Sequence, residues 1–141
     1  GKPLMLEAVL DRSILERAVK QCMADGVQRF FIVCPPRFAE AAAACIPEGA
    51  DAVISEQHAQ LLDFLDNDEN TLVLCRAAVP FAQAGPGFAY AAPGRELRSV
   101  WQEKMTNAIS GASLVPGWLP VYGPETIAEL EPVLAELEKK Q

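Results

Sequence analysis

The sequence contains little of several residue types on which whole classes of proteins depend. There is one histidine in 141 residues, and the four cysteines form no Cys-x-x-Cys pair. A structural zinc site usually takes four cysteine and histidine ligands at such spacings, so we expect none. No apolar run approaches the roughly 18–20 residues of a membrane-spanning helix, and the start of the chain shows no signal-peptide pattern. The sequence therefore predicts a cytoplasmic protein.

Basic residues are also few. Lysine and arginine together number 12, against 19 aspartate and glutamate residues, which gives a formal net charge of -7. Such a chain repels nucleic acids and anionic membranes, so neither is expected as a partner. Half of the residues are hydrophobic, and a domain of this length buries roughly 68–70% of its unfolded surface. We expect a core without disulfides, with buried free thiols at Cys22, Cys34, Cys45 and Cys75.

Short apolar runs alternate with amphipathic segments along the chain. The run at 30–34 is unbroken, which is typical of a strand covered on both faces. Ser13-Ile14-Leu15-Glu16 has the pattern of a capping box that starts a helix, and Asp25-Gly26 of a helix end. The expected strands are 4–9, 30–34, 51–54, 71–75 and 118–122, and the expected helices are 14–24, 38–45, 56–65, 96–110 and 124–140.

This order of elements favours βαβ units with right-handed crossovers. The predicted fold is α/β, a Rossmann-like three-layer domain with a mostly parallel sheet of about five strands. We expect residues 1–141 to form a single domain, with an irregular loop at 76–95, which is rich in alanine, proline and glycine, and a C-terminal helix at 124–140. Pro132 should bend or restart that helix. The helix docks either on its own sheet or on a second copy, so a homodimer is an open alternative.

A nucleotide site in such a fold needs a glycine-rich turn after the first strand, at the carboxyl edge of the sheet. The turn Leu10-Asp11-Arg12-Ser13 contains no glycine and is too short to wrap a diphosphate. Asp11 would also repel an anion. We therefore expect no phosphate-binding loop at this position.

Two later segments carry a resemblance to a known family. The chain reads Glu56-Gln57-His58-Ala59 and, further on, Leu72-Val73-Leu74-Cys75-Arg76-Ala77-Ala78-Val79-Pro80-Phe81. This order is similar to the sugar-nucleotidyltransferases, particularly the N-acetylglucosamine-1-phosphate uridylyltransferase domain, in which E-Q-x-G-T-G-H-A precedes L-x-L-x-G-D-V-P-L. The segment 26–33 is similar to the family's next turn and strand, and residues 11–14 stand where G-K-P-M opens a helix. The resemblance covers about residues 3–81.

The departures from the family concern the groups that carry its chemistry. In the family, a glycine-rich loop binds the triphosphate, G-T-G contacts the uracil, and the aspartate of G-D-V-P-L holds magnesium. Here the loop and the G-T-G are missing, and Ala77-Ala78 replace the Gly-Asp pair. Nucleotidyl transfer depends on charge neutralisation by metal and cations. The resemblance therefore implies a catalytically degraded, nucleotidyltransferase-like pseudoenzyme without catalytic residues or cofactor; magnesium is expected only if transferase activity survives.

Three residues are candidates for ligand contact. Gln57 and His58 stand at the start of a predicted helix, and Arg76 directly follows a predicted strand, where a guanidinium can bind carboxylate or phosphate. The more ordinary roles are a solvated or capping side chain for His58 and a salt bridge for Arg76. The expected ligand is a nucleotide or a sugar phosphate. Two alternatives stay open: an active sugar-phosphate nucleotidyltransferase whose catalytic loop lies outside this chain, and an unrelated flavodoxin-like module for protein interaction.

Overall fold

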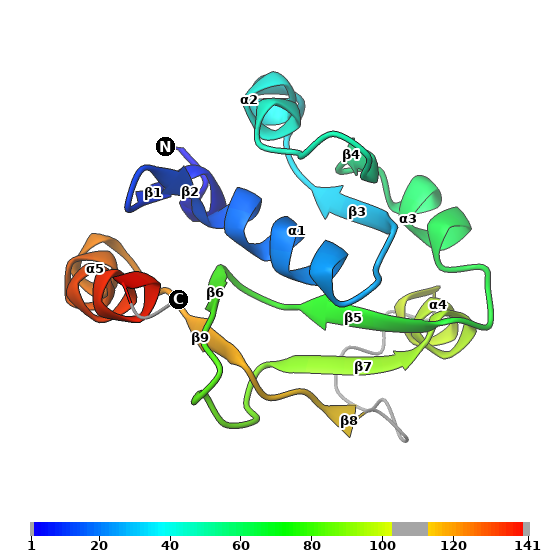
Figure 1. Cartoon of the computed structure of the whole chain (residues 1–141). Coiled ribbons are helices and arrows are strands. Elements are labelled where there is room, and N and C mark those ends of the chain that lie inside the picture. The colour runs from blue at the N-terminus through cyan, green and yellow to red at the C-terminus, as the bar shows by residue number, and fades with distance from the viewer. Residues whose placement is uncertain (1, 103–112, 140–141) are drawn as a thin grey trace.

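The computed structural model describes residues 2–102 and 113–139. Within these ranges the chain forms five α-helices, two short 3-10 helices and nine strands (Figure 1). The helices are η1 (Leu4–Leu6), α1 (Ile14–Ala24), η2 (Pro36–Phe38), α2 (Ala39–Ala44), α3 (His58–Phe64), α4 (Gly94–Gln102) and α5 (Pro124–Lys139). The strands are β1 (Ala8–Val9), β2 (Arg12–Ser13), β3 (Arg29–Val33), β4 (Asp51–Ser55), β5 (Asn70–Leu74), β6 (Ala78–Pro80), β7 (Ala89–Pro93), β8 (Ser113–Leu114) and β9 (Trp118–Pro120).

The prediction of a Rossmann-like, mostly parallel sheet of about five strands is wrong. The described strands form four small sheets, and only β3 and β4 pair in parallel. The pairs β1–β2, β5–β7, β7–β8 and β6–β9 are all antiparallel. After β5 the chain passes through β6 and returns as β7 beside β5, so no helix crosses over between these two neighbours. The order of strands and helices along a chain does not determine which strands pair. The predicted fold is wrong because its strand pairing was inferred from that order alone.

The strand expected at 4–9 does not form as one element. Leu4–Leu6 turn into η1, in which Leu6 N donates a hydrogen bond to Pro3 O at 3.0 Å, and only Ala8–Val9 are extended as β1. Proline fixes its own φ and favours such a turn directly after it. The remaining two-residue strand is too short to serve as the centre of a sheet.

The turn between β1 and β2 has an unusual backbone. Leu10 and Asp11 have φ values of 50° and 68°, in the left-handed region that a two-residue hairpin turn requires. Neither residue has the conformational freedom of glycine, so contacts from other elements must hold the turn. Arg17 Nε donates to Val9 O at 2.9 Å, and Leu10 N donates to Glu131 Oε2 at 3.1 Å. Helices α1 and α5 thus fix the hairpin from two sides.

Helix α1 begins as its capping pattern predicts. Ser13 is the N-cap, and its Oγ accepts a hydrogen bond from Glu16 N at 3.0 Å. The Glu16 carboxylate lies 3.8 Å from both Arg12 Nε and Lys20 Nζ on the exposed side of the helix. The opposite face is apolar and buried, with Ile14, Leu15, Ala18, Val19 and Cys22.

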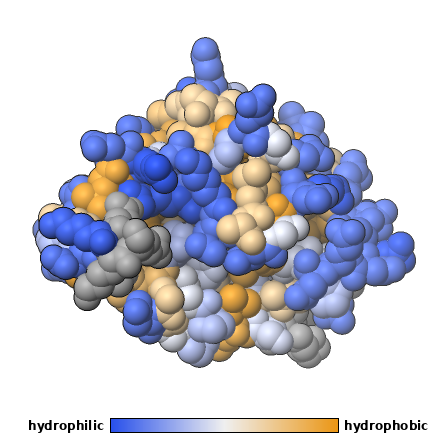
Figure 2. All heavy atoms as spheres, in the orientation of Figure 1, coloured by the Kyte–Doolittle hydropathy of each residue, from blue (hydrophilic) through white to orange (hydrophobic). Residues whose placement is uncertain are grey.

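Three clusters of buried apolar residues in the described chain lie around α1, and a fourth, made of Leu65, Ala92 and Leu97, contains no residue of α1. The first cluster joins the start of α1 to the inner face of α5 and consists of Val9, Ile14, Ala77, Val79, Val121, Ile127, Leu130 and Leu134. The second lies between α1, α2 and β3, and the third between α1, β5, β7 and Trp118. Because α1 contributes to all three, it is the element around which the small sheets assemble. On the face in Figure 2, hydrophobic residues reach the surface in small patches separated by hydrophilic ones.

Several predicted elements have the expected position but not the expected extent. The strands at 30–34, 51–54 and 71–75 are confirmed as β3, β4 and β5 within one residue at each end, and that at 118–122 is shortened to β9. The region 76–95 is not an irregular loop, because it contains β6 and β7. The C-terminal helix is confirmed as α5 and continues through Pro132; residue 140 lies outside the described residues, as does 103–110 of the helix expected at 96–110. None of the described helices has the length and apolarity needed to cross a bilayer.

The cysteines differ in their exposure. Cys22 and Cys34 are buried, Cys45 is half-buried and Cys75 is exposed, and all four thiols are free. The expectation of four buried thiols is therefore wrong for Cys45 and for Cys75, which lies just after the end of β5. Burial, and secondarily the charge of Asp25, raises the pKa of Cys22 from 9.0 to about 11.

This shift predicts a loss of stability in alkali. The pKa of the Cys22 thiol is 9.0 without these effects and about 11 in the folded protein, so the unfolded chain loses this proton first. The contribution of Cys22 is fully present below about pH 9 and disappears as the pH rises towards about 11. Urea unfolding midpoints across this range should decline less in Cys22→Ala than in the unchanged protein, while Cys45→Ala should keep the full decline. Equal declines in all three proteins would contradict the assignment.

Candidate functional site

A pocket lies at the carboxyl ends of the two parallel strands. β3 ends at Val33 and β4 at Ser55, and Cys34 N donates to Ser55 O at 3.2 Å where the two segments leave the sheet. The first residues of η2 and α2 form the opposite wall. The pocket has a volume of about 180 Å³ and is lined by Cys34, Pro36, Ala39, Ile54, Ser55, Glu56 and Gln57. We refer to it as the Glu56–Gln57 pocket.

The lining combines an apolar wall with a polar rim. Pro36, Ala39 and Ile54 offer only hydrocarbon to a ligand, whereas Glu56 and Gln57 carry a carboxylate and an amide. Ser55 Oγ accepts a hydrogen bond from Gln57 N at 3.0 Å, which fixes the turn that carries both polar residues. The Gln57 amide forms no hydrogen bond within the part of the chain that the structure describes, so its donor and acceptor are available.

Cys34 is part of the lining but has the wrong chemistry for a nucleophile. The Cys34 thiol donates a hydrogen bond to Pro35 O, with 3.4 Å between Sγ and the oxygen. Burial, and secondarily the charge of Glu56, raises the pKa of this thiol above its ordinary value. The thiol therefore stays protonated at neutral pH, and the thiolate is the reactive form of cysteine. Cys34 serves as an apolar wall of the pocket.

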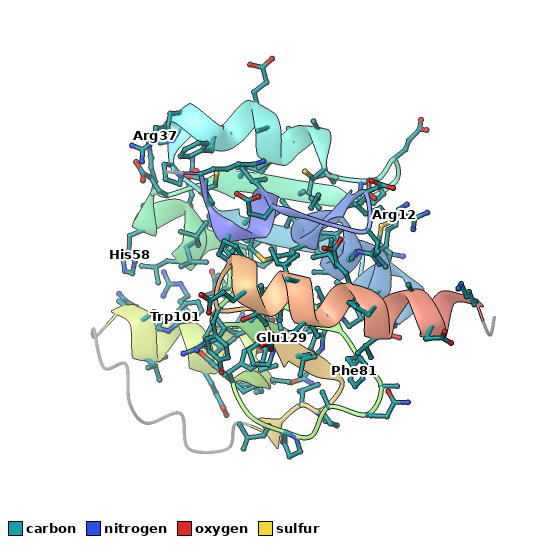
Figure 3. All side chains as sticks on the ribbon, turned by 90° about the vertical axis from the view of Figure 1, so that its left-hand side faces the viewer. Arg12, Arg37, His58, Phe81, Trp101 and Glu129 are labelled. Carbon is teal, nitrogen blue, oxygen red and sulfur yellow. The ribbon has the colours of Figure 1, made fainter. Side chains whose placement is uncertain are left out.

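The three predicted contact residues are not brought together. Gln57 lines the pocket, and His58, the first residue of α3, does not. In Figure 3 the labelled His58 lies at the edge of the molecule, between Arg37 and Trp101. Arg76 is elsewhere, with its guanidinium carbon 5.1 Å from the centroid of the Tyr122 ring. Among the described residues Arg76 forms no salt bridge, which was the more ordinary role expected for it. Its guanidinium instead stacks on the Tyr122 ring.

The hairpin turn after β1 is a second place where a phosphate could have been bound. Its Leu10 N–H is the kind of donor that a phosphate uses, but it already donates to the Glu131 carboxylate. Arg17 Nε is likewise engaged with Val9 O. A carboxylate at this position repels an anionic ligand.

The residues present do not fit a magnesium ion. The resemblance places the metal-binding aspartate at Ala78, which is 0% exposed and packs with Ala18, Cys22 and Trp118. A methyl group cannot ligate a metal, and Mg²⁺ requires oxygen ligands. Within residues 2–102 and 113–139, no group of three histidine, cysteine, aspartate or glutamate residues is arranged to hold a metal ion.

Of the candidate contact residues from the sequence, only Gln57 lines this pocket, and the rest of the lining was not among them. Gln57 was a candidate from its place at the start of a predicted helix, whereas Pro36 and Ala39 belong to the helical turns that follow β3. The signal for them was Pro35-Pro36 directly after the apolar run of β3, because a second proline starts a helical turn at the strand's carboxyl end. No protein-family model, curated protein or solved structure matches the chain.

Proposed function

We propose that this chain is a nucleotidyltransferase-like domain that binds the base of a uridine nucleotide or sugar nucleotide in the Glu56–Gln57 pocket without catalysing transfer. The observation that carries the proposal is that Glu56 and Gln57 line a pocket at the carboxyl ends of parallel strands. In open α/β sheets, ligands bind at this end of the parallel strands. The same two residues are the E-Q pair of the uridylyltransferase resemblance.

The chemistry of the rim favours a neutral ring with both donors and acceptors. Gln57 offers an amide N–H and an amide oxygen, and Glu56 accepts hydrogen bonds. The imide edge of uracil presents acceptor, donor and acceptor in one plane; the Gln57 amide can donate to one carbonyl and accept from the ring N–H, and the second carbonyl stays outside these contacts. Pro36 and Ile54 supply apolar surface for the faces of the ring.

The size and charge of the pocket limit what enters it. A volume of about 180 Å³ is smaller than the roughly 300–1,000 Å³ of pockets that enclose drug-sized ligands. It accommodates one ring, so ribose and phosphates remain outside. Among the residues that the structure describes, no arginine or lysine lines the pocket, and Glu56 repels phosphate. The proposal therefore predicts that adding phosphates to uridine does not tighten binding.

Calorimetric titration of the chain with uridine, uridine monophosphate and a uridine sugar nucleotide tests this function. We expect saturable binding of uridine and of the sugar nucleotide, and no gain from the phosphate. Gln57→Ala should weaken binding about three- to tenfold, the effect of losing one neutral hydrogen bond. His58→Ala, one residue further and outside the lining, should change affinity less than about twofold.

The opposite results would remove the proposal. Absence of uridine binding, or equal affinities in Gln57→Ala and the unchanged protein, would exclude this pocket as the site. Pyrophosphate release from UTP and N-acetylglucosamine 1-phosphate would instead support the active-transferase alternative.

A protein-interaction module is the second candidate function. It is favoured by large apolar side chains that are exposed in the described structure, among them Val33 at 67%, Tyr122 at 68% and Leu114 at 59%. Val33 lies at the end of β3, on a strand whose second edge has no partner among the described strands.

A further inference from the structure

The carboxylate of Glu56 is free to accept hydrogen bonds from a ligand. Within residues 2–102 and 113–139, it forms no hydrogen bond and no salt bridge. The residue is exposed and lines the Glu56–Gln57 pocket. Burial, and secondarily the charge of Glu56, raises the pKa of the Cys34 thiol in the pocket wall, so the carboxylate lies close to that wall.

The base proposed for this pocket offers Glu56 nothing to bind. A carboxylate only accepts hydrogen bonds. A uracil ring that is substituted at N1 has one polar hydrogen, on the imide nitrogen, and the Gln57 amide accepts it. Both carbonyl groups of the ring are acceptors, and they repel a carboxylate. The donor for Glu56 therefore has to lie outside the base.

The local backbone also directs Glu56 and Gln57 to different parts of a ligand. Gln57 is extended, with φ −80° and ψ 121°, and its N–H is held by Ser55 Oγ at 3.0 Å. An extended residue directs its side chain away from that of its neighbour. The two polar side chains therefore do not follow the same edge of one flat ring.

The sugar of a nucleoside is the part that lies at the rim of this pocket. A volume of about 180 Å³ holds one ring, so the attached ribose remains at the mouth. The ribose carries neighbouring hydroxyl groups at C2′ and C3′, on the same side of its ring. The two oxygens of a carboxylate can each accept one of these hydrogens. Among the other lining residues, Ser55 Oγ already accepts from Gln57 N, and the Cys34 thiol donates to Pro35 O.

We propose that Glu56 binds the 2′- and 3′-hydroxyl groups of a ribose, so that the Glu56–Gln57 pocket takes ribonucleosides and discriminates against 2′-deoxyribonucleosides. This inference rests on the proposed function, because Gln57 holds the base in it. Hydrogen bonds to a charged acceptor are roughly twice as strong as those between neutral groups. The contact with the sugar therefore contributes more to affinity than the contact of Gln57 with the base.

Calorimetric titration with three neutral probes separates the sugar from the base. Uridine has the base and both hydroxyl groups, 2′-deoxyuridine lacks one of them, and 1-methyluracil has the base alone. Uridine should bind at least about tenfold more tightly than 2′-deoxyuridine, the effect of losing one hydrogen bond to a charged group. 1-Methyluracil should bind more weakly than both nucleosides.

Glu56→Ala should abolish the preference for the ribonucleoside. Uridine should bind this variant at least about tenfold more weakly, and its advantage over 2′-deoxyuridine should fall below about twofold. The affinity for 1-methyluracil should change by less than about twofold, because this probe has no hydroxyl group. An unchanged affinity for that probe also shows that the pocket is intact in the variant.

Two further variants serve as controls. Glu40→Ala changes the net charge by the same amount at an exposed position of α2 outside the lining, so it should keep the full preference. Gln57→Ala should weaken all three probes by a common factor and keep the ratio between uridine and 2′-deoxyuridine. Together these variants assign the base to Gln57 and the sugar to Glu56.

The remaining outcomes overturn the proposal, and they distinguish it from the proposed function. Saturable binding of uridine and 2′-deoxyuridine with equal affinities would exclude the contact with the sugar and leave the base site in place. Absence of binding by all three probes would remove both. A preference that persists in Glu56→Ala would assign the sugar to another group. Loss of the preference in Glu40→Ala would attribute it to net charge instead of Glu56.

Discussion

Replacing Gly94 with alanine should destabilise the protein by about 2–3 kcal/mol, the range of a clash in a well-packed region. A Cβ at this position would lie 2.8 Å from Leu65 O, 2.8 Å from Asn67 Oδ1 and 2.9 Å from Asn67 O. Real Cβ atoms do not approach other atoms so closely. Because two of the three atoms belong to the backbone, a side-chain rotation cannot relieve the contact.

The backbone around Gly94 is also held in place by hydrogen bonds. Gly94 N donates to Glu69 O at 2.9 Å, and Arg95 N donates to Asn67 O at 2.8 Å. Moving the 65–69 turn away from the new methyl group would stretch these bonds. The turn further carries Leu65, which is 1% exposed and packs with Leu97 of α4. The clash therefore spreads into a buried cluster instead of staying local.

Gly85→Ala is the matched control, because an added Cβ there meets nothing within 4 Å. Removing backbone freedom from the unfolded chain should leave the stability of this variant unchanged or raise it by less than about 1 kcal/mol. Urea unfolding monitored by tryptophan fluorescence measures both variants. Equal midpoints for Gly94→Ala and Gly85→Ala would show that the 65–69 turn gives way easily.

Gly94 illustrates which part of the structure the sequence could predict. In the sequence, Gly94 and the preceding Pro93 were assigned to an irregular loop, because proline and glycine are poor strand and helix formers. In the structure Pro93 ends β7 and Gly94 starts α4, and the glycine is required by a contact with a turn some 25 residues earlier. Local composition carries no information on such an approach.

Elements whose cause is local were predicted well. The Ser13 cap needs only the Glu16 amide, three residues away, and the apolar runs of β3 and β5 form strands wherever they lie. Pairing is different, because it depends on which segments meet. β5 pairs with β7 rather than with a parallel neighbour, and the alanine-rich β7 gave little sign of being a strand.

The candidate site residues were also predicted only in part, because their positions depend on the fold around them. Gln57 was a candidate because it stands at the start of a predicted helix, in the Glu56-Gln57 pair of the resemblance, and it lines the pocket. His58 follows at the next position, but it starts α3 outside the lining, since one residue of helix turns a side chain by about 100°. Arg76 was placed at the sheet's carboxyl edge under the assumption of one continuous parallel sheet. Without that sheet, β3 and β5 have separate ends, and Arg76 stacks on Tyr122.

Leu130→Ala should lower the free energy of unfolding by about 2–4 kcal/mol, whereas Val133→Ala on the same helix should change it by less than about 1 kcal/mol. Leu130 is 7% exposed and packs with Ile14 and Val79, while Val133 is 44% exposed. Helix α5 lies across the molecule in Figure 3 with its inner face towards the chain. Leu130→Ala removes three carbon atoms and Val133→Ala removes two, so most of the expected difference comes from burial.

The pair also separates docking of α5 on its own chain from docking on a second copy. If α5 packs within the chain, the unfolding midpoint of the unchanged protein is independent of protein concentration, and Leu130→Ala lowers it equally at every concentration. If α5 instead belonged to a homodimer interface, the midpoint would rise with protein concentration by mass action, and Leu130→Ala would reduce that dependence. Because Leu130 and Leu134 complete the cluster that buries Val9 and Ile14, we expect the first result. A concentration-dependent midpoint would show that this cluster is completed by a partner.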